Sequence, residues 1–217
     1  MHLPEKNTGV TQTKILHTIL RADAPMSVEG LTRHLSISRN ATYQHIMALE
    51  RDELIKKARV TQTKGRPSQT FQLTEKGKST FPKHYGLFAK LLVTLVKSRI
   101  GSQELRDCME ELGGSLAEEF RERIISLKGD DLIIEVSKIM QELGYEAEAV
   151  PNENNDGLQI RAYNCVFHDL AKEHEEVCAL DTSFISTLLG RSVDHTECVV
   201  RGGTNCQFCP KGMLRQS

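Results

Sequence analysis

Residues 27–51 read SVEGLTRHLSISRNATYQHIMALER, and this stretch decides the fold of the first half of the chain. Ser27 is a good N-cap for a short helix. The apolar residues that follow it recur at helical spacing, and they are Val28, Leu31 and Leu35. A tight turn over 36–38 then precedes a longer helix over 39–51, whose inward-facing residues are Ile46 and Leu49. A short helix, a tight turn and a longer helix form the pattern of a helix-turn-helix.

The segments on either side extend this pattern to a winged helix-turn-helix. Residues 11–22 carry apolar side chains at helical spacing and predict a preceding helix. Residues 54–60 and 68–73 predict two strands, joined by a turn over 61–67. Because a basic hairpin directly after a recognition helix is typical of a wing, we expect a DNA-binding domain over residues 1–82.

The expected DNA contacts lie at the start of the longer helix and at the tip of the hairpin. Arginine pairs with guanine edges, asparagine and glutamine pair with adenine, and hydroxyl groups bind phosphates. Arginine is also favoured in the negative potential of the minor groove. The predicted contact residues are Ser38, Arg39, Asn40, Thr42, Tyr43, Gln44, Lys64 and Arg66. The alternatives are a solvated polar helix face and a basic hairpin without a ligand.

The charge is unevenly distributed along the chain of 217 residues, although its net value is −1. Residues 1–90 contain 15 Lys and Arg against 7 Asp and Glu, a net charge of +8. Residues 91–217 contain 13 against 22, a net charge of −9. A basic half followed by an acidic half indicates a nucleic-acid-binding module joined to a module of another function.

Several classes of protein are disfavoured. The first ten residues are polar and no apolar run is long enough to cross a bilayer, so we expect a cytoplasmic protein with no membrane partner. The sequence contains no phosphate-binding loop, no nucleophile elbow and no HExxH motif. We therefore expect neither an enzyme nor a small-molecule substrate.

The second half predicts a mixed domain, so the expected fold class of the chain is α+β. Apolar residues at helical spacing over 85–100 predict a long helix within a helical region over 83–128. We expect two copies of the protein to form a homodimer through this helix. The alternative is an ordinary core helix within one chain. A sensor domain is predicted over 129–217. Across the two regions, the sequence predicts a helix from Leu105 that continues past Gly113-Gly114 to Ile124, and a second helix that ends at Gly144. Two strands are predicted over 145–150 and 158–163.

Five of the six cysteines fall within 45 residues, at Cys165, Cys178, Cys198, Cys206 and Cys209. In a cytosolic protein such a group indicates metal binding or redox chemistry, and thiolates select soft metals and iron–sulfur clusters. The spacing matches neither a zinc ribbon nor the ferredoxin run. Zinc, another metal and a thiol–disulfide switch remain alternatives. Cys108 is predicted to be a small core residue or a redox-inert thiol outside the group.

The chain resembles the SufR-like regulators, which are winged-helix repressors of iron–sulfur assembly operons. In the first half the resemblance rests on Gly65-Arg66-Pro67, Phe71-Gln72-Leu73-Thr74 and residues 81–85. In the second half it rests on Asn164-Cys165, residues 173–178 and the closing Gly203-x2-Cys206-x-Phe208. The resemblance implies a dimer with a [4Fe–4S] cluster in each subunit. With the cluster bound, the dimer would bind the operator and repress its operon. When the cluster is lost, the dimer would release the operator.

The same resemblance implies that Cys165, Cys178 and Cys206 are cluster ligands. The fourth ligand position of some relatives falls on Ser192 in this chain. We predict Cys198 as the fourth ligand, because the glycine-rich turn after it can bring it back beside Cys206; Cys209 is the alternative. His168 and His195 are possible non-thiolate ligands.

Overall fold

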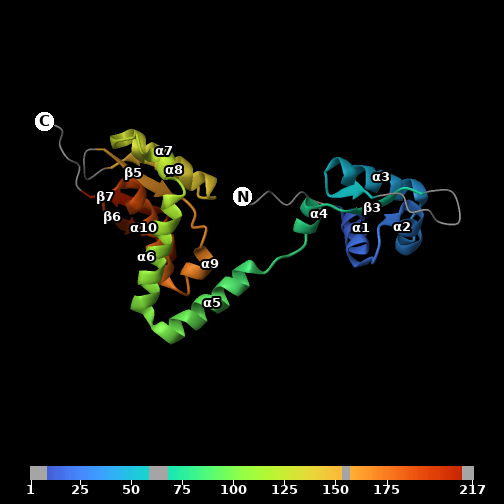
Figure 1. Ribbon diagram of the computed structural model, residues 1–217, viewed down its shortest axis with the longest axis horizontal. Helices are drawn as coiled ribbons and strands as arrows, with labels where there is room; N and C mark the ends of the chain where they lie inside the picture. Colours follow the sequence, from blue (N-terminus) through green and yellow to red (C-terminus); the bar gives the residue numbers. More distant parts are fainter. Residues whose placement is uncertain (1–8, 59–67, 153–156, 212–217) are drawn as a thin grey trace. The chain divides into compact units, whose positions relative to one another are not determined.

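The computed structural model describes residues 9–58, 68–152 and 157–211. The chain divides between Lys83 and His84 into two compact units, which are described separately (Figure 1). Helices and strands occur in both units, so the expected α+β class is confirmed. The regions predicted over 83–128 and 129–217 lie in the same compact unit. Within the described ranges, no helix has the length and apolar character needed to span a membrane.

The first unit combines helices with a small antiparallel sheet. Its helices are α1 (Val10–Arg21), α2 (Val28–Leu35), α3 (Arg39–Arg51) and α4 (Glu75–Ser79). Its strands are β1 (Met26–Ser27), β2 (Ile55–Lys57) and β3 (Thr70–Leu73), in the order β1-β3-β2. The predicted strand pair therefore forms, while the turn residues Lys64 and Arg66 fall in 59–67, outside the described residues.

Local chemistry sets the boundaries of α2 and α3. The Ser27 hydroxyl accepts a hydrogen bond from the Gly30 amide at 3.1 Å, as an N-cap does, and Ser38 caps α3 through the Ala41 amide at 3.2 Å. Ser36 ends α2 in the left-handed conformation, with φ at 53°. The buried residues at the centre of this unit are Ile15, Leu31, Ile46, Leu49, Ile55 and Phe71, so the predicted inward positions of α3 are confirmed.

The second unit packs helices on a four-stranded antiparallel sheet. Its longer helices are α5 (Tyr85–Ile100), α6 (Ser102–Glu118), α8 (Gly129–Glu142) and α10 (Cys178–Leu189), with the short α7 (Arg121–Ile124) and α9 (His168–Ala171). The strands are β4 (Ala147–Pro151), β5 (Leu158–Ala162), β6 (Val193–Glu197) and β7 (Cys206–Pro210). Their order in the sheet is β4-β5-β7-β6.

One predicted helix of this unit has a different end. We expected the helix from Leu105 to continue to Ile124, but α6 ends at Glu118 and α7 is separate. Phe120 leaves the helical path with ψ near 4°, and its ring packs edge-on against Phe184 of α10 at 6.0 Å. A tertiary contact therefore ends the helix where the apolar periodicity alone would carry it on.

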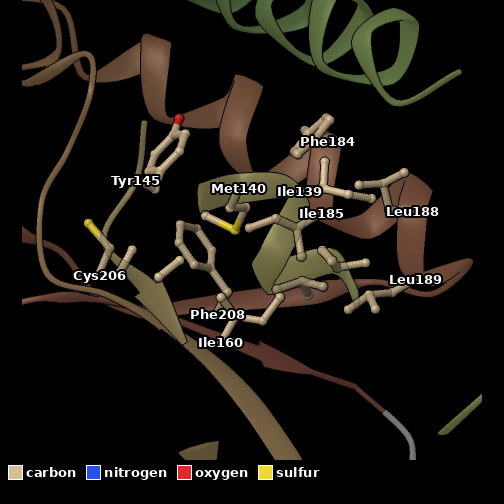
Figure 2. Packing of buried hydrophobic residues seen from close by; sticks show 14 of the residues in the cluster. Ile139, Met140, Tyr145, Ile160, Phe184, Ile185, Leu188, Leu189, Cys206 and Phe208 are labelled. Atoms are coloured by element: carbon tan, nitrogen blue, oxygen red, sulfur yellow. The ribbon is translucent and has the colours of Figure 1, made fainter. Parts of the chain in front are cut away.

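The core of the second unit lies between the sheet and helices α8 and α10 (Figure 2). Ile139 and Met140 from α8 meet Ile185 and Leu188 from α10, and the sheet contributes Ile160 and Phe208. Cys206 lies at the border of this core, near Tyr145, with its sulfur atom directed away from Phe208 (Figure 2). The core thus holds the start of β7 firmly and presents its cysteine at one edge.

Candidate metal centre

Four of the five clustered cysteines come from four separate segments of the second unit. Cys165 follows β5, Cys178 begins α10, Cys198 follows β6, and Cys206 begins β7. β7 lies between β5 and β6, with Cys206 opposite Ala162, so the sheet order brings these segments to one end. Cys178, Cys198 and Cys206 are buried, and Cys165 is partly exposed.

Cys198 is the centre of this thiol group. Its thiol lies close enough to those of Cys165, Cys178 and Cys206 to raise the pKa of each. Burial raises the pKa of Cys178 and of Cys206 to about 12, and the proximity of Cys198 adds to both shifts. Burial likewise raises the pKa of Cys165 to about 11. Without a cation these thiols are protonated at neutral pH, and a bound metal would displace their protons.

His195 joins this group from β6. One ligand atom each from His195, Cys198 and Cys206 can be chosen so that all lie within 4.8 Å of one another, and the three residues could hold a metal ion. The imidazole stacks on Phe208, its cross-strand partner, with ring centroids 4.6 Å apart. Its Nε2 atom is buried and has no hydrogen-bond partner. Burial and the charge of Arg201 lower the pKa of His195, which favours the neutral ring that can bind a metal.

The loop between Cys198 and Cys206 is held by hydrogen bonds of its own. The Gly203 amide donates to the Cys198 carbonyl at 2.9 Å, which folds the chain back as the glycine-rich turn predicted. A Cβ at position 203 would lie 2.9 Å from that carbonyl oxygen, so glycine is needed there. The Glu197 carboxylate accepts hydrogen bonds from the Thr204 amide at 2.8 Å and from Gln207 at 2.7 Å.

Three other candidate residues lie outside the group. Cys209 belongs to the opposite face of β7 from Cys206, because side chains alternate along a strand. Its thiol donates to Gln159 at 2.8 Å, so the structure gives no support to Cys209 as the fourth ligand. His168 is exposed and its nearest polar partner is Asp169. Cys108 also lies outside the group, and because it is exposed on α6, the first of the two roles predicted for it, that of a core residue, is wrong.

The segment that joins Cys165 to Cys178 rests on α5. Lys90 forms an ion pair with Glu173 at 2.5 Å, and the Thr94 hydroxyl lies 2.9 Å from His174 Nε2. Lys97 forms an ion pair with the buried Glu176 at 2.7 Å, which completes a row of three contacts along one face of the helix. This connection was missed from the sequence, although the spacing of residues 90, 94 and 97 placed them on one face of α5.

The predicted DNA-contacting residues at the start of α3 are exposed, except for one. Arg39, Asn40, Tyr43 and Gln44 are exposed on one face, and Arg39 forms an ion pair with Glu29 at 2.7 Å. Ser38 is exposed, and its hydroxyl caps the helix.

Thr42 is a correction to the predicted contacts, because its side chain is fully buried. Its hydroxyl donates to the Ser38 carbonyl at 3.0 Å and lies 3.0 Å from the hydroxyl of Thr32. Thr42 therefore joins α2 to α3 and is not available to a ligand.

Comparison with known proteins adds no assignment to this geometry. No protein-family model matches the chain, and no curated protein matches it either. Its function is therefore inferred from the placement and the chemistry of its own side chains.

Proposed function

We propose that this protein is a DNA-binding transcription repressor whose second unit binds a thiolate-ligated metal cofactor. The observation that carries the proposal is the meeting of Cys165, Cys178, Cys198 and Cys206 from four separate segments of one domain. Buried thiols of ordinary core positions have no reason to gather in this way, whereas a soft metal neutralises several thiolates at once.

The proposal of DNA binding draws on the first unit. The order of α1, α2, α3 and the β2–β3 pair is typical of a winged helix-turn-helix. The exposed residues Arg39, Asn40, Tyr43 and Gln44 at the start of α3 are types that read base edges or bind phosphates. The net charge of +8 over residues 1–90 favours approach to DNA.

For the cofactor we propose an iron–sulfur cluster of the [4Fe–4S] type. The donor set fits it, since Fe–S clusters are held by cysteine thiolates. When bound, such a cluster supplies a centre that is sensitive to oxidation and to iron supply. Following the resemblance to SufR-like regulators, we propose that the regulated genes are those of iron–sulfur cluster assembly, and that the cell compartment is the cytoplasm.

A second candidate cofactor is a single zinc ion. The observation that favours it is the His195, Cys198 and Cys206 group, whose ligand atoms lie within 4.8 Å of one another. Zinc binds mixed imidazole and thiolate ligands in a compact tetrahedral site. The regulator would then sense zinc or thiol oxidation through the same residues.

We also propose that the protein is a homodimer whose two copies contact each other through α5. The face of α5 that carries Lys90, Thr94 and Lys97 contacts the rest of its unit. The opposite face is apolar and exposed in the single chain, and its residues are Phe88, Leu91, Leu92 and Leu95. A second copy would cover this face and would give the two DNA-binding units the two-fold symmetry of an operator.

The proposal is tested on full-length protein purified without oxygen. We expect a brown protein that contains iron and acid-labile sulfide, a dimer in sedimentation equilibrium, and enrichment of a symmetric site from a library of random DNA duplexes. Arg39→Ala and Gln44→Ala should each weaken binding to that site by about 5- to 150-fold, the loss of a base contact, while Arg51→Ala at the other end of α3 serves as the control. Colourless protein with one zinc per chain would select the second cofactor. Failure to enrich any duplex would refute DNA binding.

A further inference from the structure

His195 carries a buried ring nitrogen with nothing to bind. Among the residues that the structure describes, few buried side-chain atoms lack a hydrogen-bond partner, and His195 Nε2 is one of them. Such an atom normally costs free energy, because it has lost its water without gaining a partner. An imidazole nitrogen with a free lone pair is also the commonest metal ligand in proteins.

The ring is held so that it can act as a ligand. It lies flat on Phe208, at an interplanar angle of 17°, and Phe208 is itself almost fully buried. A ring fixed by stacking in this way presents its unpartnered Nε2 atom in one direction.

The atoms nearest to a tetrahedral geometry are those of His195, Cys198 and Cys206. With metal–sulfur bonds of about 2.3 Å and metal–nitrogen bonds of about 2.0 Å, neighbouring ligand atoms of a tetrahedral site lie about 3.5–3.8 Å apart. The three ligand atoms lie within 4.8 Å, so a closure of about 1 Å by side-chain rotation satisfies that geometry. Cys178 is the next thiol, since it lies near Cys198 at the start of α10 and is similarly buried.

Cys165 differs from the other three thiols. It is not in the group of His195, Cys198 and Cys206, whose ligand atoms lie within 4.8 Å of one another. It is partly exposed and lines a pocket between α5 and α9, together with Leu87 and Phe167. Cys165 therefore borders the thiol group and has access to a separate space.

We propose that His195, through Nε2, is a ligand of the metal centre together with Cys178, Cys198 and Cys206, and that Cys165 lies outside the ligand set. The inference rests on the metal centre of the proposed function and replaces one thiolate of its predicted ligand set by an imidazole. A donor set of three thiolates and one imidazole suits Zn²⁺ and other soft or borderline divalent ions in a closed tetrahedral site.

The direct test uses Cd²⁺ alone as the probe, on reduced full-length protein labelled with ¹⁵N-histidine. We expect one ¹¹³Cd resonance with the chemical shift of three thiolates and one nitrogen, and a one-bond coupling to a single histidine. His195→Phe keeps a ring on Phe208 and removes the nitrogen, so the coupling should disappear and the affinity for Co²⁺ should fall by about tenfold or more. His168→Phe is the matched control and should change neither reading.

Cys165→Ser provides a second reading that is independent of the stability of the His195 variant. We expect the ¹¹³Cd shift and the thiolate-to-Co²⁺ absorption to stay as in the parent protein, because the number of bound thiolates does not change. A loss of one thiolate in Cys165→Ser, with no histidine coupling in the parent, would overturn the inference and leave the four-cysteine site standing. If neither Cd²⁺ nor Co²⁺ binds at all, the metal centre of the proposed function fails with it.

Discussion

Gly113 lies at a close approach of α6 to α10. A Cβ atom at this position would lie 2.3 Å from the Leu180 carbonyl oxygen and 2.9 Å from the Phe184 amide nitrogen. Both are backbone atoms, so a side chain cannot be accommodated by a rotamer change. Gly114, one position further, has only side-chain atoms of Ser183 and Thr187 nearby, at 3.9 and 3.8 Å.

Substitution of these two glycines should have opposite effects on stability. Gly113→Ala should lower the free energy of unfolding by about 1–3 kcal/mol, since it forces the two helices apart. Gly114→Ala should raise it by about 0.5–1 kcal/mol, because alanine is the better helix former and meets only ordinary van der Waals contacts. Urea denaturation followed by circular dichroism measures both. Equal stability of the two variants would mean that the close approach does not constrain the unit.

Residue-level predictions succeeded where the period of the element was applied and failed where residue type alone was used. Thr42 was grouped with the DNA contacts because it is polar, yet it lies four residues before Ile46 and seven before Leu49, on the buried face of α3. Cys209 is three residues after Cys206, so a strand places the two thiols on opposite faces. The correction of Thr42 and the choice of Cys198 over the alternative Cys209 were therefore both accessible from the sequence.

Arg123 joins two elements by a pair of ion pairs. It extends from α7, and its guanidinium donates to Glu135 and to Glu142 of α8, each at 2.6 Å. This contact fixes the short α7, which follows the break at Phe120, against a longer helix. The hydrogen bond from Arg123 is the main cause that lowers the pKa of Glu135.

Arg123→Ala should therefore destabilise the second unit, and the loss should depend on pH. We expect about 1 kcal/mol at neutral pH, because the groups are partly exposed to solvent and salt. Since the pKa of Glu135 is lower in the folded state, its contribution is fully present above the ordinary pKa of a glutamate and is lost as the pH falls through the depressed value. Thermal unfolding at neutral and acidic pH measures the difference, with Arg121→Ala as the control. A difference between variant and parent that stays constant into acid would contradict this assignment.

At the scale of elements, the sequence predicted well whatever depends on local periodicity. The helix predicted over 85–100 has those bounds, and the strands predicted over 145–150 and 158–163 lie at β4 and β5. The predicted end of α6 was wrong, because the helix ends at the Phe120–Phe184 contact, which joins residues far apart in sequence. The strand order β4-β5-β7-β6 brings the cysteines together. The spacing of the cysteines along the chain does not encode that order, so the sequence alone could not predict their meeting.

At the scale of the whole molecule, α5 connects two proposed functions. One face carries the proposed dimer contact, and the other is tied to the segment that joins Cys165 to Cys178. The Lys97–Glu176 pair is the most buried of these ties, because the Glu176 side chain is only 8% exposed. A shift of the cysteine segment on metal loss would therefore be transmitted to the helix that we propose as the dimer contact.

Lys97→Met should uncouple the two functions. We expect the variant to bind metal and DNA, with the difference in DNA affinity between loaded and metal-free protein reduced at least several-fold relative to the parent. Lys90→Met removes the more exposed Lys90–Glu173 pair and should keep most of the difference. The measurement is a fluorescence anisotropy titration of the enriched duplex with and without metal. Full retention of the metal response in Lys97→Met would show that the signal takes another route.

The Glu197 carboxylate and the fold-back of Gly203 give the loop between Cys198 and Cys206 its shape from protein contacts alone. Two of the candidate ligands are thus preorganised before any ion arrives, and little conformational entropy remains to be lost on binding. Ion uptake should accordingly be fast and should not drive folding, unlike in a classical zinc finger. The chain would then remain a stable, folded receptor between signals, ready to be reloaded.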